Sequence, residues 1–124
     1  MAINPAYIPN VVAAAGAVGA QYQAVKYSAA NTVTVVTAAT DDVVGILQNA
    51  PAAAGDECVV VFFGTCQWQA GGAVNLPDQV HTDASGDCIA ATAAQITQGI
   101  AMHGAALADG DIATVTVNFM NVLA

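Results

Sequence analysis

The amino-acid sequence predicts an all-β domain: a compact β-barrel or sandwich-like fold built from two internal repeats, with an extended N-terminal arm. The first observation is the repeat itself, because Gly45-Ile46 and Gly55-Asp56, separated by an Ala-rich spacer, return as Gly99-Ile100 and Gly110-Asp111. The second is the period-two alternation of apolar and polar residues, which is typical of half-buried strands. The third is a regular series of Gly- and Asp-containing turn signals between short β-branched runs, which is typical of sandwiches and small barrels.

Residues 1–20 are predicted to form an arm outside the β domain. Pro5 and Pro9 disfavour helix at its start, and the apolar run 11–20 is far shorter than the ~20 residues of a membrane-spanning helix. No Lys or Arg precedes that run, so the segment does not match a signal peptide. Residues 21–124 then form the β domain, with pseudo-repeats at 21–64 and 76–119. The arm residues predicted to contact a partner are Ile3, Pro5, Tyr7, Ile8, Pro9, Val11 and Val12.

The strands are expected in order along the β domain. Residues 21–27 and 32–35 alternate with period two. Gly64 is expected to lie in a turn. The Ala-rich stretches 50–54 and 90–94 are expected to be loops with at most a turn or two of helix, because each is short and interrupted by Pro or Thr. Further short strands are expected at 43–48, 58–63, 67–69, 79–82, 88–91, 97–102 and 112–119.

The repeated motif is architectural, since it contains no catalytic group. Gly45-Ile46 and Gly99-Ile100 are expected in equivalent strands, and Gly55-Asp56 and Gly110-Asp111 in equivalent turns. Glycine supplies backbone angles that a β-branched residue disfavours. The residues predicted to have these structural roles are Gly45, Gly55, Asp56, Gly99, Gly110 and Asp111.

Composition limits the partners of this chain. Its 124 residues include one Lys, no Arg and nine acidic residues, for a formal net charge of −8. Phosphate backbones and anionic lipid headgroups are bound by clustered Lys and Arg, so neither nucleic acid nor a membrane is an expected partner. Only 8% of the residues are charged, against roughly a quarter to a third on an ordinary soluble surface. This shortage indicates a surface that is covered by protein, either copies of the same chain or a larger partner.

No motif for catalysis or cofactor binding is present. There is no nucleophile elbow, phosphate-binding glycine loop or H-E-x-x-H, and His81 and His103 are isolated from each other in the sequence. Residues 83–87 resemble part of a calcium loop, but the glycine is wrongly spaced and Ala94 stands where the closing Glu is needed. We therefore predict that the chain is not an enzyme and has no metal and no cofactor.

The cysteines do not form the pattern of a disulfide scaffold. Cys58, Cys66 and Cys88 are odd in number and include no C-x-x-C pair. Such cysteines usually behave as small buried hydrophobic residues in a reducing compartment.

Trp68 is the one residue that suggests a binding surface. A Trp flanked by Gln residues fits a contact with a subunit or partner, where both its rigid area and its indole N–H are useful, and this is the role we assign to it. The alternative is a carbohydrate- or ligand-binding β module in which Trp68 stacks on the ligand together with Tyr22 or Tyr27.

The order of these motifs resembles the capsid cement (head decoration) proteins of tailed bacteriophages. The resemblance covers roughly residues 21–119, and its motifs are short turns and strands. In that family a glycine-isoleucine or glycine-valine strand, a Gly-Asp turn and a Thr-Asp-Ala-x-Gly turn recur around a compact β domain. The matching segments here are Val44-Gly45-Ile46, Gly55-Asp56, Gly64, Ala70 to Val74, Val80 to Gly86, Gly99-Ile100-Ala101 and Gly110-Asp111.

The resemblance implies a structural role in the virion. Proteins of this kind bind the outside of the mature, expanded head, commonly as homotrimers, and hold neighbouring major capsid protein subunits together against the internal pressure of DNA. It also implies a place on the outer capsid surface, after a period in the host cytoplasm during assembly. The segment 1–20 has no counterpart in the family pattern, so its role as a capsid contact rests on its composition.

Overall fold

The computed structural model of this chain describes residues 5–75, 78–91, 98–102 and 108–119. Within these ranges it contains a ten-stranded sheet and a single 3-10 turn, and the all-β prediction is confirmed. The elements are β1 (Ala6–Tyr7), β2 (Val12–Ala13), η1 (Ala15–Ala17), β3 (Ala24–Ala29), β4 (Thr32–Val35), β5 (Gly45–Leu47), β6 (Val60–Gln69), β7 (Gln79–Thr82), β8 (Cys88–Ala90), β9 (Gly99–Ala101) and β10 (Ile112–Asn118).

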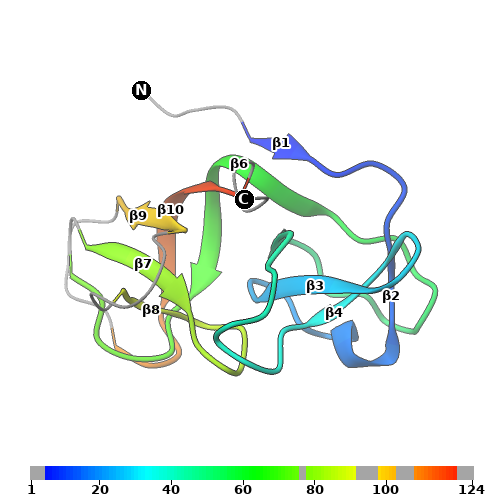
Figure 1. Cartoon of the computed structure of the whole chain (residues 1–124), viewed down its shortest axis with the longest axis horizontal. Helices are drawn as coiled ribbons and strands as arrows, with labels where there is room; N and C mark the ends of the chain where they lie inside the picture. Colours follow the sequence, from blue (N-terminus) through cyan, green and yellow to red (C-terminus); the bar gives the residue numbers. More distant parts are fainter. Residues whose placement is uncertain (1–4, 76–77, 92–97, 103–107, 120–124) are drawn as a thin grey trace.

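The hydrogen-bonded order of the sheet is β2-β4-β3-β5-β6-β10-β9-β7-β8, and β1 pairs with β6 outside this path. The same order of strands therefore occurs twice, running inward from the two ends of the sheet: β4-β3-β5-β6 on one side corresponds to β8-β7-β9-β10 on the other. Figure 1 shows the two groups as separate lobes, with β2, β3 and β4 on the right, β7 to β10 on the left, and β6 running from one lobe to the other.

The register of strand pairing is the same in the two groups. Val25 of β3 pairs with Gly45 of β5, and Val80 of β7 pairs with Gly99 of β9. In the next pair of strands, Ile46 lies opposite Val61 and Ile100 lies opposite Thr116. The prediction of two internal repeats with Gly45-Ile46 and Gly99-Ile100 in equivalent strands is thus confirmed strand by strand.

The N-terminal segment is extended, as predicted, but it lies along the domain and belongs to the first repeat. Ala13 forms a parallel pair with Val33 of β4, and Ala70, just after β6, forms a parallel bridge with Cys88 of β8. The amide of the next residue completes the match, since Ala14 N–H donates to the carbonyl of Val33 and Gly71 N–H to that of Cys88, both at 2.8 Å. The boundary predicted at residue 20 is therefore wrong, because small apolar residues let this segment pack closely on β4.

Strand β6 is shared between the repeats. Its first residues pair with β5 and β1, while Phe63 to Gln69 pair with β10. We therefore define repeat 1 as residues 6–63 and repeat 2 as residues 64–119, in place of the predicted 21–64 and 76–119. The prediction that Gly64 lies in a turn between strands is wrong, because Gly64 lies inside β6 and its φ of +104° lets the strand bend and continue. The predicted strands 58–63 and 67–69 are consequently one element.

Most other strands lie within their predicted ranges. β4 and β7 have the predicted bounds, and β5, β8, β9 and β10 are shorter than expected at one or both ends. The stretch 50–54 is a loop, as predicted, whereas most of the stretch 90–94 lies outside the described residues.

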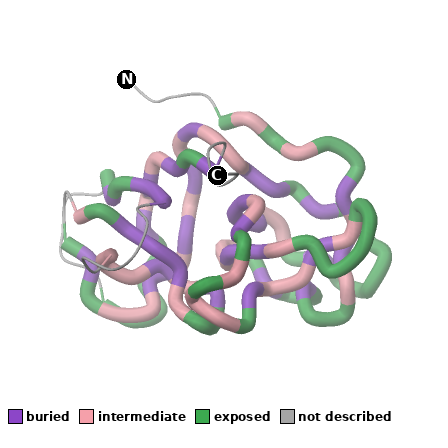
Figure 2. Tube along the Cα trace, in the orientation of Figure 1, coloured by how far each residue is buried: buried purple, intermediate pink, exposed green. Residues whose placement is uncertain are grey.

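The buried residues form two clusters, and Figure 2 shows buried segments in both lobes. The core of repeat 1 consists of Val11, Ala13, Ala17, Ala20, Val25, Val33, Leu47, Cys58 and Val60. Their counterparts in repeat 2 belong to the second buried cluster, and they are Trp68, Ala70, Val74, Val80, Cys88, Ala101, Ala113 and Val115. Only the counterpart of Ala20 lies outside the described residues.

The glycines of the repeated motif have two different roles. Gly55 and Gly110 lie in equivalent turns, as predicted, with φ of +93° and +92°. The following aspartates stabilise these turns, since Asp56 accepts from the Ala53 amide at 3.1 Å and Asp111 from the Ala108 amide at 3.0 Å.

Gly45 and Gly99 are strand residues, the first of β5 and the first of β9. A Cβ on Gly45 would lie 2.5 Å from the carbonyl oxygen of Val61, and a Cβ on Gly99 would lie 2.7 Å from that of Thr116. Only glycine allows the two backbones to approach this closely.

Candidate functional site

The structure divides the predicted contact residues of the N-terminal segment into two groups. Pro5, Tyr7 and Pro9 are exposed, and the Tyr7 side chain is 50% exposed. Val11 is buried in the core of repeat 1, so the prediction that it grips a partner is wrong. Ile8 is half-buried and packs against that core. Val12 is half-buried, and Ile3 lies outside the described residues.

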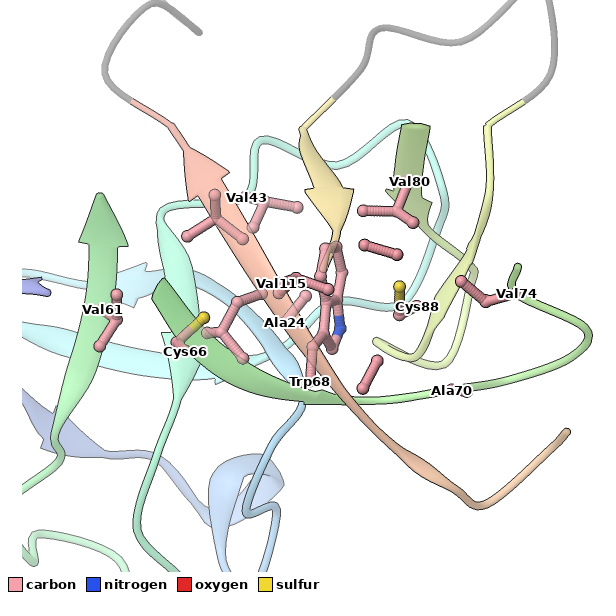
Figure 3. Packing of buried hydrophobic residues seen from close by; sticks show 14 of the residues in the cluster. Ala24, Val43, Val61, Cys66, Trp68, Ala70, Val74, Val80, Cys88 and Val115 are labelled. Atoms are coloured by element: carbon pink, nitrogen blue, oxygen red, sulfur yellow. The ribbon is translucent and has the colours of Figure 1, made fainter. Parts of the chain in front are cut away.

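Trp68 is fully buried, which contradicts both the predicted contact with a subunit or partner and the sugar-stacking alternative. Its indole Nε1–H donates to the carbonyl oxygen of Gly86 at 2.9 Å. The ring of Phe119 packs edge-on against it, with centroids 6.4 Å apart and planes at 65°. Figure 3 shows Trp68 among Val80, Cys88 and Val115. Its polar Gln neighbours misled the prediction, because alternation in β6 points those neighbours outward and Trp68 inward.

A groove of about 790 Å³ lies in the described part of the chain, lined by residues of repeat 1 and by Phe119 of repeat 2. Its walls are predominantly apolar and come from segments far apart in the sequence. Sequence reasoning missed it, because no local pattern reports on a surface assembled from such distant segments. The lining residues are Ile8, Pro9, Lys26, Tyr27, Asp41, Asp42, Val43, Val44, Phe62 and Phe119.

An ion pair lies beside the apolar wall of this groove. Lys26 Nζ is 2.8 Å from Asp41 Oδ2, and the same oxygen accepts from the amides of Thr37 at 2.8 Å and Ala38 at 3.0 Å. The hydrogen bond from Lys26, together with those from the two amides, lowers the pKa of Asp41 from 3.8 to about 2. The single cation of the chain is thus already neutralised within repeat 1.

Repeat 2 exposes apolar side chains on β9 and β10. Ile100 is 43% exposed, Met102 is 54% exposed and Ile112 is 38% exposed. Met102 follows β9, and its amide donates to the carbonyl of Thr114 at 2.7 Å, so it lies beside β10. Scattered exposed apolar residues are ordinary, and these are of interest because of their position relative to repeat 1, described below.

The residues considered for chemistry are placed as structural groups. Asp83 Oδ1 accepts from the amides of Ser85 at 2.8 Å and Asp87 at 2.9 Å, so this carboxylate closes its own turn. His81 Nε2 lies 2.8 Å from the carbonyl of Ala39, while His103 lies outside the described residues. In the described ranges, no group of three or more His, Cys, Asp or Glu side chains is arranged to hold a metal ion.

The three cysteines are buried free thiols, as predicted. Burial raises the pKa of Cys66 and of Cys88 to about 12, and burial followed by the nearby charge of Asp56 raises that of Cys58. A thiol whose pKa is raised in this way is a poor nucleophile, because the thiolate is the reactive form.

Comparison with known proteins does not assign this chain to a family. No family model matches the sequence, and no curated protein matches it. None of the helical structure in the described residues is both long and apolar enough to span a membrane.

Proposed function

We propose that this chain is a structural protein that binds the outer surface of a mature bacteriophage head as a homotrimer and holds neighbouring major capsid protein subunits together. The observation that supports this most directly is the placement of the residues on which the resemblance rests. Gly45-Ile46 and Gly99-Ile100 occupy equivalent strands, and Gly55-Asp56 and Gly110-Asp111 occupy equivalent turns, within one compact β domain. Those motifs therefore have a common architectural role.

The surface chemistry fits a partner that is recognised without ion pairs. The chain has one cation, and Asp41 already neutralises it. Strand β1 pairs with β6 along one edge, and a partner strand added at its other edge would be held by main-chain hydrogen bonds. The exposed residues Pro5 and Tyr7 lie in and beside β1, so this segment is the part of the N-terminus that we assign to the capsid contact.

Multivalent binding of a trimer to the capsid would explain how the protein holds neighbouring subunits together. Once one chain of a trimer has bound a capsid subunit, the contacts of the other two become intramolecular, and their effective concentration is high. Contacts through β1 that are weak individually would then hold several capsid subunits together.

The test is co-sedimentation of the purified protein with expanded, undecorated heads, followed by heating and measurement of DNA release. We expect saturable binding and a higher temperature of DNA release. Tyr7→Asp should reduce occupancy, while Val18→Asp, at another exposed apolar position, should bind as the wild type does. Failure of the wild type to bind any head would overturn the proposal.

The carbohydrate-binding alternative has a different signature. It would now depend on Tyr22 and Tyr27 without Trp68, because Trp68 is buried. Saturable binding of glycans by the isolated protein, abolished by Tyr27→Ala, would favour it over the capsid role.

A further inference from the structure

The two repeats pack on each other through one particular face of repeat 1. Ala24, Val36, Val43, Ile46 and Val61 belong to repeat 1, yet they are buried in the cluster that contains Trp68 and Val80 of repeat 2. Main-chain contacts support this packing, since the Ala24 amide donates to the Gly86 carbonyl at 2.7 Å. We call these five residues the donor face of repeat 1.

The same face of repeat 2 has no such cover from the described residues. Val25 and Val80 are equivalent, and so are Ile46 and Ile100, which makes Gln79 the counterpart of Ala24. Ile46 is fully buried, whereas Ile100 is 43% exposed and Gln79 is also exposed. Ile100 is therefore the exposed counterpart of Ile46, which packs at the contact between the two repeats.

The surface of repeat 2 that packs against the donor face of repeat 1 also differs from its counterpart on repeat 1: it is buried, and the counterpart is not. On repeat 2, Cys66, His81 and Val117 are buried, and His81 contacts the carbonyl of Ala39 in repeat 1. The equivalent positions on repeat 1 are taken by Pro9, Lys26 and Phe62. All three line the groove of about 790 Å³, and none of them is buried.

We propose that a second copy of this chain fills this groove. The Ile100 face of its repeat 2, which contains Gln79 and Ile100, would lie against Pro9, Tyr27 and Phe62 of the first copy. The contact between copies would repeat the contact between repeats 1 and 2 within one chain. The inference rests on the self-association included in the proposed function, and it names the interface. The contact is head-to-tail, so it can close into a ring such as the proposed trimer.

The chemistry of the two surfaces is compatible. The groove is mainly apolar and its ion pair between Lys26 and Asp41 is already formed. Gln79 and Ile100 bring no charge to it. Docking would therefore bury apolar area without breaking the pair between Lys26 and Asp41, which would be the costly outcome at an interface. Asp42, the other charged residue of the groove, is exposed.

The experiment measures the oligomeric state by sedimentation velocity for the wild type, Ile100→Glu, Tyr27→Glu and a mixture of the two variants. Tyr27 is 48% exposed, so both substitutions are at surface positions, and circular dichroism and melting confirm folding. Val59→Glu, which alters an apolar residue that is 36% exposed and belongs to neither surface, is the matched control. We expect the wild type and the control to associate and each of the other variants to be monomeric.

The mixture tests the head-to-tail geometry. Ile100→Glu keeps an intact groove and Tyr27→Glu keeps an intact Ile100 face, so the mixture should form one-to-one dimers and nothing larger. A monomeric wild type, association of Tyr27→Glu equal to that of the wild type, or a mixture that stays monomeric would each overturn the inference. The second of these results, association of Tyr27→Glu equal to that of the wild type, would indicate a symmetric contact between two Ile100 faces.

Head binding separates this inference from the proposed function. Association with the expected variant pattern, without binding to heads, would leave the interface standing and remove the capsid role. If the protein binds heads but Ile100→Glu and Tyr27→Glu do not change its association, the capsid role would stand and the proposed interface would be removed.

Discussion

Val11 and Trp68 occupy equivalent positions in the two repeats, and both are buried, with exposures of 1% and 0%. The Cys58 amide donates to the carbonyl of Val11, and Trp68 pairs with Ala113, the counterpart of Cys58. The larger side chain lets the core of repeat 2 reach the turn at Gly86, which packs against Ala24 of repeat 1. The centre of one repeat is thereby connected to the surface of the other.

The burial of Val11 leads to the first prediction. Val11→Asp should lower the free energy of unfolding by about 3–5 kcal/mol, because it leaves an uncompensated charge in the core. Tyr7→Asp, in the same segment but half exposed, should change it by no more than about 0.5 kcal/mol. Urea unfolding of both variants measures the difference, and equal effects would mean that the N-terminal segment is not part of the core.

Trp68 is the only Trp in the chain, so its fluorescence reports on a single site. Its emission should be blue-shifted and poorly quenched by acrylamide in the native state, and it should shift to the red on unfolding. Trp68→Ala should cost about 3–5 kcal/mol of stability. Emission typical of exposed Trp in the folded protein would contradict its burial.

The repeat could be predicted from the sequence, whereas the first strand of repeat 1 could not. Gly45-Ile46 and Gly99-Ile100 are recognisable because close backbone approach requires the glycine in both copies. Val11 and Trp68 share no side-chain likeness, and their equivalence lies in backbone hydrogen bonds. Ala/Gly-rich composition predicts an arm because it lacks a periodic apolar face, although small residues also permit close packing.

Two glycines with similar backbone angles allow the contribution of the contact between repeats to the free energy of unfolding to be measured. Gly86 and Gly110 have φ of +85° and +92°, but a Cβ on Gly86 would lie 2.8 Å from Val35 Cγ1, whereas a Cβ on Gly110 would meet nothing within 4 Å. Gly110→Ala should cost about 1–2 kcal/mol from the backbone alone. Gly86→Ala should cost more, because it also separates the repeats. Equal losses in thermal or urea unfolding would show that the Gly86 contact contributes little.

Acid sensitivity should depend on Asp41. Its pKa is lowered from 3.8 to about 2 in the folded state, so its carboxylate favours folding above the ordinary value, and that contribution is lost as the pH falls from about 4 toward 2. Asp41→Asn should lower the melting temperature at pH 6 and weaken its dependence on pH below 4. Asp42→Asn, which alters a carboxylate in the same groove and leaves the pair between Lys26 and Asp41 in place, is the matched control. A pH profile of Asp41→Asn parallel to that of the wild type would contradict this assignment.

The thiols should be protected until the protein unfolds. Because burial raises the pKa of Cys66 and Cys88 to about 12, almost no thiolate is present at pH 8. Ellman's reagent should therefore react slowly with native protein and rapidly with all three cysteines in guanidinium. Fast labelling of Cys66 or Cys88 in native protein, located by mass spectrometry, would indicate that repeat 2 opens readily.

The sharing of β6 between the repeats has a mechanical consequence. Two domains joined by a linker can be separated by breaking the non-covalent contacts between them. Here a force that draws the two lobes apart acts along the backbone of one strand, which is paired with β5 and β1 at its start and with β10 beyond Phe63. Because the two halves of β6 are joined without slack, extension of the molecule along β6 requires that strand to be pulled out of one of the two cores. Resistance to tension is then set by the unfolding of a whole repeat, and the molecule responds to a stretching load as a single body.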